Sequence, residues 1–371
     1  MQFTIPKSHI IDVLSRIQGL TGRKSNLAIT ASVLVRATAE GLTLAATDLE
    51  TGFIGNFKAE VVSEGSIAIN ARKFFEIVRD FPSDEIKVHE IENHWIEIGT
   101  EKVQYHIVGM NPDDFPEIPR IEDSNFFEMD AAKLKKMIEQ TGAIGPVDEK
   151  RAHILGTYME RLDIEGCKRV RMVSTDGSRL STANYNFDAG VDLPSGPGIL
   201  IPKKGLIEVS KFINDEDTVR VIIKNNNIVF KKETETIIIR LLEGVFPKYE
   251  DIISKEQGFE IKIDKAPFAM LLRRMSILSS ENYKGVVFKF EEDTLTVHST
   301  NPEIGESRED MEIAYGEKPL EMAFNPKYFT DTLNVIDDAQ VVLTLVDEEK
   351  PCLIEGENDK TFISVIMPMR I

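Results

Sequence analysis

The sequence predicts an α+β protein of three repeated domains, each with two helices and antiparallel sheets. The chain has 371 residues, more than one hydrophobic core usually organises, so two or three domains are expected. A four-part sequence pattern also recurs along the chain at a period of about 125 residues. Short apolar stretches with strand-like alternation separate the amphipathic helical stretches, which favours antiparallel sheets over a doubly wound parallel sheet.

The repeated pattern has four signals in a fixed order. Each repeat opens with a short strand that leads into a helix, then has a Thr-Asp or Thr-Asn turn, a second helix start with basic residues, and a closing proline motif. The openings start at Phe3, Phe127 and Ile261, the turns are Thr47-Asp48, Thr175-Asp176 and Thr300-Asn301, the second helix starts follow Ile69, Ile201 and Phe324, and the closing motifs are Phe115-Pro116, Phe246-Pro247 and Met367-Pro368. This spacing predicts domains at residues 1–122, 123–256 and 257–371.

The first repeat illustrates the local prediction. Ile10, Val13, Leu14 and Ile17 form one apolar helix face, and Ser8 is a plausible N-cap. A second helix is expected from Lys73 to Arg79. The expected strands are Phe3–Ile5, 33–38, Leu42–Ala46, Phe53–Val61, Ser66–Ile69, Ile86–Ile91, Trp95–Ile98 and Val103–Ile107.

Bulk composition excludes several classes of protein. Hydrophobic residues make up 42% and charged residues 29%, as in ordinary folded proteins, and no apolar run approaches a membrane span. The N-terminal stretch has no signal-peptide pattern, so a cytoplasmic location is expected. Cys167 and Cys352 provide no disulfide framework or metal cage and are expected to be buried or partly buried. The net charge of −18 argues against a surface that simply adheres to nucleic acid.

Motifs for catalysis are not found in the sequence. It contains no phosphate-binding glycine loop and no nucleophile elbow. His89 and His94 are one residue too far apart for a zinc-protease helix. Asp48 and Asp176 could be carboxylates of a hydrolase, but Asn301 replaces them in the third repeat, and the context predicts a turn. We therefore expect no catalytic residue, no cofactor and no metal site, with a hydrolase built from scattered carboxylates as the alternative.

Basic residues are scarce and gather near the predicted helices and the turns that enter them. They are Arg23, Lys24, Arg72, Lys73 and Arg79 in the first repeat, Lys133, Lys135, Lys136, Lys203, Lys204 and Lys211 in the second, and Arg273, Arg274 and Lys327 in the third. The pattern suits either solvated helices or one basic face on an acidic protein. A basic face could contact phosphates without reading sequence.

Several of these segments resemble one family, the β subunit of bacterial DNA polymerase III, or sliding clamp. They are ATDLE at 46–50, ARKFFEIVRDFP at 71–82, DDFP at 113–116, STDGSRL at 174–180, IPKKGLIE at 201–208, FPKYEDII at 246–253, ENYKGVVF at 281–288 and VIMPMRI at 365–371. The resemblance spans the chain and implies a non-catalytic processivity factor. Two copies would form a head-to-tail homodimer, a ring of clamp domains around duplex DNA that tethers polymerases, the clamp loader and repair proteins.

The resemblance also implies three sets of functional residues. A pocket for short partner peptides would be lined by Arg151, Ile154, Thr175, Gly177, Arg179, Leu180, Pro247, Asn325, Tyr328, Met367, Pro368, Met369 and Arg370. DNA would face Lys24, Arg72, Arg79, Lys203 and Lys204, and the dimer would join Lys73, Tyr105 and Ile107 to Ile277, Leu278 and Glu303. Ser178 and Asp251 depart from the family pattern, where His and Arg are common, and Asp251 would place a negative charge at the pocket rim.

Overall fold

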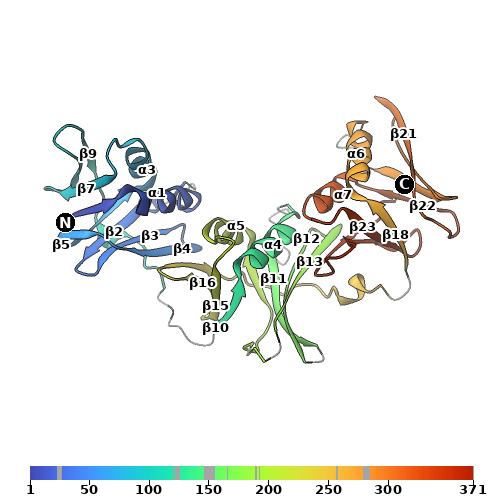
Figure 1. Ribbon diagram of the computed structural model, residues 1–371, viewed down its shortest axis with the longest axis horizontal. Coiled ribbons are helices and arrows are strands. Elements are labelled where there is room, and N and C mark those ends of the chain that lie inside the picture. Colours follow the sequence, from blue (N-terminus) through green and yellow to red (C-terminus); the bar gives the residue numbers. More distant parts are fainter. Residues whose placement is uncertain are drawn as a thin grey trace. The chain divides into compact units, whose positions relative to one another are not determined.

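The computed structural model describes the chain except for residues 23–26, 120, 122–125, 146–154, 165, 189, 192, 256–257, 279–284 and 371 (Figure 1). It contains two compact units. Unit 1 comprises Met1–Lys135 and Lys204–Leu241, and unit 2 comprises Lys136–Lys203 and Leu242–Ile371. The division falls within α4 (Ala131–Gly142) and at the first residue of α5 (Lys203–Phe212), both in the second predicted repeat.

Unit 1 holds two antiparallel sheets. The five-stranded sheet has the order β5-β1-β7-β8-β9, and the eight-stranded sheet has the order β10-β15-β16-β17-β4-β3-β2-β6. The strands are β1 (Gln2–Pro6), β2 (Ser32–Thr38), β3 (Gly41–Thr47), β4 (Thr51–Phe57), β5 (Glu60–Ser63), β6 (Gly65–Asn70), β7 (Glu85–Glu90), β8 (Trp95–Gly99), β9 (Gln104–Val108), β10 (Phe126–Asp130), β15 (Thr218–Lys224), β16 (Asn227–Lys232) and β17 (Glu235–Arg240). Helices α1 (Lys7–Arg16) and α3 (Ala71–Asp80) pack against each other.

Unit 2 also holds two antiparallel sheets, with orders β14-β11-β12-β13-β25-β24-β23-β18 and β21-β20-β19-β22. The strands are β11 (Gly156–Ile164), β12 (Cys167–Thr175), β13 (Arg179–Asn186), β14 (Ile199–Pro202), β18 (Phe259–Asp264), β19 (Val286–Glu291), β20 (Thr294–Asn301), β21 (Gly305–Glu312), β22 (Leu320–Phe324), β23 (Gln340–Leu345), β24 (Cys352–Gly356) and β25 (Phe362–Ile366). Helices α6 (Lys265–Met275) and α7 (Pro326–Leu333) pack together.

Both eight-stranded sheets join strands of two neighbouring predicted repeats. In unit 1, β4 of the first repeat pairs with β17 of the second, and in unit 2, β13 of the second repeat pairs with β25 of the third. Each half of the second repeat is therefore hydrogen-bonded to a different neighbour. This explains why the two compact units do not coincide with three repeats.

The third repeat has an aromatic core under its two helices. Phe268 on α6 and Phe329 on α7 meet Phe288 of β19 and Phe324 of β22, and all four side chains are fully buried. The ring of Phe329 lies 5.1 Å from Phe288 and 5.2 Å from Phe324. These contacts fix the amphipathic face of α7, the helix that carries Asn325 at its N-cap.

Some local predictions differ from the structure. Helix α1 begins at Lys7 after Pro6, so Ser8 lies inside the first turn and is not the N-cap. The stretch Phe53–Val61 forms two strands, β4 and β5, and they lie in different sheets. Cys167 is exposed, because it stands at the end of the β11–β12 hairpin, whereas Cys352 is buried as expected.

Among the described residues, no helix is long and apolar enough to cross a membrane. The same part of the chain holds no cluster of three or more His, Cys, Asp or Glu side chains suited to a metal ion. His89 is an exposed residue on β7, and His94 lies in a turn with a positive φ of 62°. The structure therefore does not bring these two histidines into a metal-binding arrangement.

We expect Phe329→Ala to lower the free energy of unfolding by about 3–5 kcal/mol, because it removes a ring packed against three others. Urea titration followed by circular dichroism measures the change. Phe126→Ala is the matched control, since Phe126 is 38% exposed, and it should cost less than about 1 kcal/mol. Equal losses in the two variants would contradict the assigned core.

Candidate functional site

The predicted pocket contains a tightly bonded turn between β12 and β13. The hydroxyl of Thr175 donates to the carbonyl of Arg179 (2.7 Å) and accepts from the backbone N–H of Gly177 (3.1 Å). Oδ1 of Asp176 accepts from the N–H groups of Ser178 and Arg179, both at 3.0 Å. Gly177 has a φ of +90°, a left-handed conformation that glycine adopts without strain. The Thr-Asp pair is therefore a turn-forming element, as predicted.

Arg179 connects this turn to helix α7. Its Nε bonds Oδ2 of Asp176 at 3.0 Å, and a terminal nitrogen bonds Oδ2 of Asp331 at 2.8 Å. The guanidinium also lies 4.3 Å from the ring centre of Tyr328. The Arg179 side chain is only 8% exposed, so these charge-assisted bonds are shielded from water and hold the guanidinium against the Tyr328 ring.

The C-terminal segment of the third repeat links the turn to strand β22. The N–H of Met367 donates to the carbonyl of Ser178 (3.0 Å), and the N–H of Met369 donates to the carbonyl of Ala323 (2.7 Å). Both methionine side chains are 39% exposed. Flexible thioether side chains held on a fixed backbone suit contact with varied apolar ligands. We call Thr175, Gly177, Arg179, Tyr328, Met367 and Met369 the partner patch.

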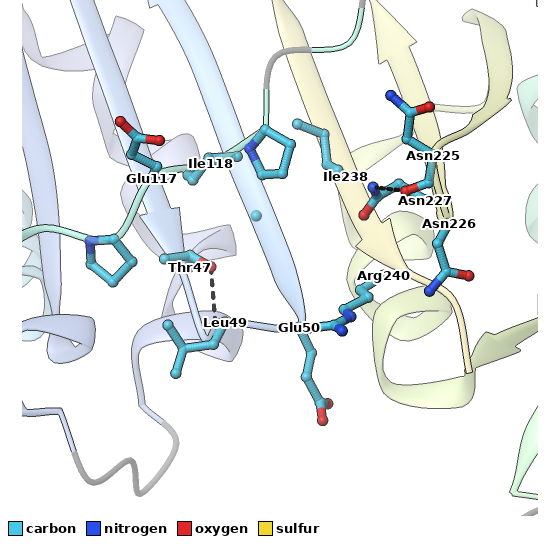
Figure 2. Close-up of a pocket in the computed structure, with 13 residues that line it drawn as sticks. Thr47, Leu49, Glu50, Glu117, Ile118, Asn225, Asn226, Asn227, Ile238 and Arg240 are labelled. Atoms are coloured by element: carbon cyan, nitrogen blue, oxygen red, sulfur yellow. Dashed lines mark hydrogen bonds between the residues drawn. The ribbon is translucent and has the colours of Figure 1, made fainter. Parts of the chain in front are cut away.

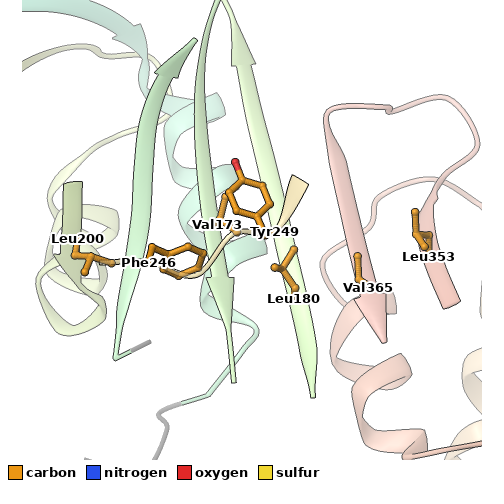
Figure 3. Close-up of a cluster of buried hydrophobic side chains, with 7 residues drawn as sticks. All are labelled: Val173, Leu180, Leu200, Phe246, Tyr249, Leu353 and Val365. Atoms are coloured by element: carbon orange, nitrogen blue, oxygen red, sulfur yellow. The ribbon is translucent and has the colours of Figure 1, made fainter. Parts of the chain in front are cut away.

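A buried apolar cluster supports the partner patch (Figure 3). It contains Leu180 and Phe246, which place the turn and the Phe246-Pro247 motif together, and the remaining members are Val173, Leu200, Tyr249, Leu353 and Val365. Tyr158 stacks on Phe246 with ring centres 4.9 Å apart and an interplanar angle of 5°. The second and third repeats thus share one core at this site.

A polar network joined to the cluster through Tyr249 was not predicted from the sequence. The hydroxyl of Tyr249 donates to Glu160, and Arg171 donates to the same hydroxyl at 3.3 Å. Burial, together with the bond to Glu160, raises the pKa of Tyr249 well above its usual range. Glu160 and Arg171 are opposite each other on the neighbouring strands β11 and β12. The alternation of side chains along these two strands was therefore the sequence signal that could have predicted their pairing.

The structure describes four of the other predicted pocket residues. Asn325 caps α7 by accepting a bond from the N–H of Lys327 (3.0 Å), and Pro247 follows Phe246 on the surface. Pro368 is half-buried and Arg370 is exposed. Arg151 and Ile154 lie outside the described residues. The departures Ser178 and Asp251 are both exposed, with Asp251 in a short 3-10 helix (Glu250–Ile253).

The predicted DNA-facing residues differ in their surroundings. The side chains of Arg72 and Arg79 on α3 are 80% and 54% exposed and pair with Glu76 (3.1 Å) and Asp80 (2.8 Å). Lys204 is exposed at the start of α5. The remaining two are Lys203, whose Nζ donates to the carbonyls of Ile144 (3.0 Å) and Gly145 (3.4 Å), and Lys24, which lies outside the described residues. The amine of Lys203 is thus less available to a phosphate than that of Lys204.

The predicted dimer residues divide between the two units. Tyr105 and Ile107 are on β9, an end strand of the five-stranded sheet, and the Lys73 side chain on α3 is 66% exposed. Ile277, which is 73% exposed, and Leu278 lie in a short 3-10 helix after α6. The last member, Glu303, is exposed in the turn before β21, itself an end strand.

Comparison with known proteins identifies the family. Models of the N-terminal, central and C-terminal domains of the DNA polymerase III beta subunit match residues 1–119, 128–248 and 250–370 in succession. The chain belongs to the DNA polymerase III beta subunit family. This confirms the resemblance found in the sequence and the predicted fold class.

Individual relatives match this chain over their full lengths. The beta sliding clamps of Pseudomonas putida and Salmonella typhimurium are 27% and 28% identical to this chain, with 100% of both chains covered. The solved DNA polymerase III subunit beta from Pseudomonas aeruginosa has a TM-score of 0.91 at 26% identity, with complete coverage. A sliding clamp from Bartonella birtlesii, solved bound to griselimycin, has a TM-score of 0.92 at 26% identity over both whole chains. These findings support the predicted function, a DNA polymerase processivity factor.

Lys203 predicts a pH dependence of stability. Burial lowers the pKa of Lys203 to about 8, with the charge of Asp176 opposing the shift. Because the folded pKa lies below the ordinary value of 10.5, the unfolded chain binds more protons between these pH values. The contribution of Lys203 to stability should therefore rise with pH across this window, by about 2–3 kcal/mol. Urea titrations at pH 7.5 and 9.5 should show a smaller rise for Lys203→Met, and parallel profiles would contradict the shift.

Proposed function

We propose that two copies of this chain close head to tail into a ring around duplex DNA. The ring would hold DNA polymerases, the clamp loader and repair proteins on the template without catalysing a reaction, and it would act in the cytoplasm. The observation that carries this proposal is the pairing of strands between repeats. Two such junctions exist within the chain, and the two strands for a third, β9 and β21, are end strands whose outer edges are unpaired among the described residues.

The two internal junctions have the same register. In the first, Thr51 of β4 is opposite Ile239 of β17, and in the second, Arg179 of β13 is opposite Ile366 of β25. The equivalent positions are 128 residues apart on one strand (51 to 179) and 127 on the other (239 to 366). One pairing rule therefore joins successive repeats.

The same rule gives a register for a third junction. Isolated bridges mark equivalent points in the three repeats, Ala68–Met110, Leu200–Leu242 and Ala323–Met369. Ile107 lies three residues before Met110. In the same way, Ile239 lies three residues before Leu242, and Ile366 lies three residues before Met369, so the three isoleucines are equivalent. The other strand is aligned by three pairs at equivalent places, Thr47–Gly52, Thr175–Leu180 and Thr300–Glu306. The residue before the second member of each pair is Thr51, Arg179 or Gly305, so Gly305 is the equivalent of Thr51 and Arg179.

The third junction would thus pair β21 of one copy with β9 of another. Gly305 would be opposite Ile107 and Ser307 opposite Tyr105 in the antiparallel ladder. End strands carry unpaired backbone groups that favour such pairing, and a two-fold dimer supplies two equivalent junctions that close the ring. Exposure of Lys73, Ile277 and Glu303 leaves them available at this interface.

Charge supports a ring that encircles DNA without gripping it. The net charge of −18 opposes tight adsorption to a polyanion. The exposed cations of α3 are paired with acidic neighbours, and these side-chain bonds lower the pKa of Glu76 and of Asp80. Contacts from Arg72, Arg79 and Lys204 to phosphates would then be weak and sequence-neutral. Retention by topology with weak contacts allows sliding.

The features of the partner patch support peptide capture over the alternative of a hydrolase. Exposed methionines beside a fixed aromatic ring suit an apolar peptide anchor. By contrast, the carboxylates of Asp48 and Asp176 accept backbone N–H groups in their own turns, as structural groups do. Griselimycin, bound in the solved Bartonella clamp, is a convenient ligand for testing the patch.

Disulfide trapping tests the ring. Tyr105→Cys combined with Ser307→Cys, in a Cys167→Ser background, should give covalent dimers near twice 41.8 kDa on non-reducing gels. Directly opposite residues of antiparallel strands have Cβ atoms about 4.5–5.5 Å apart, close to disulfide reach.

The control moves one cysteine out of register. Tyr105→Cys with Asp310→Cys displaces the thiols by three residues, about 10 Å, and should remain unlinked. Equal trapping of both pairs, or a monomer at high concentration in analytical ultracentrifugation, would overturn the ring.

Met367→Glu tests the partner patch. A carboxylate placed in an apolar contact loses hydration without gaining a partner, so affinity for griselimycin should fall at least tenfold, about 1.4 kcal/mol. Isothermal titration calorimetry measures the affinity. Met270→Glu is the matched control on α6, where Met270 is 53% exposed, and it should bind as wild type. Wild-type binding by Met367→Glu would place the ligand elsewhere.

A further inference from the structure

A cavity of about 390 Å³ lies in unit 1, where the first and second repeats join (Figure 2). The turn before β4, the segment Pro116–Pro119, the turn Asn225–Asn227 and strand β17 line it. Ile118 and Ile238 supply apolar surface, and the asparagines supply amides. Its volume lies within the range of ligand-binding sites.

The turn that lines this cavity has the same bonds as the turn of the partner patch. Thr47 Oγ1 donates to the carbonyl of Thr51 and accepts from the N–H of Leu49, both at 3.0 Å. Oδ1 of Asp48 accepts from the N–H groups of Glu50 (3.1 Å) and Thr51 (2.7 Å). Thr175 and Asp176 make the corresponding bonds in the second repeat.

The segment after the first repeat is also equivalent. Phe115 and Ile118 precede Phe246 and Tyr249 by 131 residues each. Phe115 is buried in a cluster against which Ile118 packs, as Phe246 and Tyr249 share the cluster below the partner patch. Both sites therefore use a Thr-Asp turn, a Phe-Pro segment and a junction between neighbouring repeats.

Leu49 is the feature that most suggests a ligand. It has a φ of +79°, close to the +90° of the equivalent Gly177, but a leucine is strained in this conformation. Its side chain is 50% exposed and stands beside Thr47 at the cavity (Figure 2). A leucine at this φ adds strain, and a half-exposed side chain buries little apolar surface in return, so Leu49 contributes little to the stability of the fold. Its side chain is available to an occupant of the cavity.

The charges around the cavity indicate what the occupant carries. Glu50 and Glu117 are exposed carboxylates, and Arg240 is the one cation among the lining residues. The backbone N–H of Arg240 donates to the carbonyl of Glu50 at 2.9 Å, which holds β17 next to the turn. The lining therefore combines an apolar floor, amides and an excess of negative charge.

We propose that this cavity is a second peptide-binding site. Its occupant is a short extended peptide from a protein partner, with an apolar anchor side chain against Leu49, Ile118 and Ile238 and a basic residue next to the anchor. The asparagine amides of the β15–β16 turn suit the peptide backbone, and Glu50 and Glu117 complement the basic residue. This site goes beyond the proposed function, which needs only the partner patch.

Selection from a display library of random octapeptides tests the proposal. The bait is the full chain with Met367→Glu, which disables the partner patch. Selected peptides should carry an apolar residue beside Lys or Arg. A synthetic peptide of the selected consensus should bind wild-type protein in fluorescence polarisation, and Leu49→Gly should weaken its binding at least tenfold. Glu117→Gln should weaken it to a smaller degree.

Leu27→Gly is the matched control, because Leu27 is 49% exposed and does not line the cavity. It should bind the peptide as wild type, and Leu49→Gly should keep its melting temperature and its affinity for griselimycin. The proposal is overturned if no basic apolar consensus is selected, or if Leu49→Gly binds it as well as wild type. A lower melting temperature for Leu49→Gly would also overturn it, because the leucine would then serve stability.

Discussion

Hydrogen bonding between end strands of neighbouring repeats is the constraint on which the rest of the structure depends. Pairing of β4 with β17 and of β13 with β25 turns separate domains into two continuous eight-stranded sheets. Each junction brings together a Thr-Asp turn, a Phe-Pro segment and the end of a strand from the neighbouring repeat. The two proposed binding surfaces therefore follow from how the repeats are joined.

The Thr-Asp turn shows how a small local element serves more than one role. Its side chains satisfy backbone N–H groups, so the chain reverses with few exposed polar groups. In the second repeat, the turn presents Arg179, which reaches Asp331 and Tyr328 and so links the turn to α7. In the first repeat, the same backbone presents Leu49 at a strained φ.

The acidity of the chain fits the same architecture. Arg72 and Arg79 on α3, two of the predicted DNA contacts, form ion pairs that weaken their attraction for phosphates. The amine of Lys203 donates to backbone carbonyls. A protein that depends on enclosure needs few strong phosphate contacts, whereas a protein that holds DNA by affinity needs many. Charge alone could not separate these cases, because the side-chain partners of each cation come from tertiary contacts.

The sequence alone determined the number of repeats, the antiparallel α+β class and the turn role of Asp48 and Asp176. Periodicity and turn chemistry are local, so they can be read from neighbouring residues. The tertiary structure decided which strands join across repeats, the exposure of Cys167, and the network of Tyr249, Glu160 and Arg171. It also decided that Arg179 meets Asp331, 152 residues away, and that Leu49 borders a cavity. Such contacts depend on strand register and packing between distant segments, which no local pattern encodes.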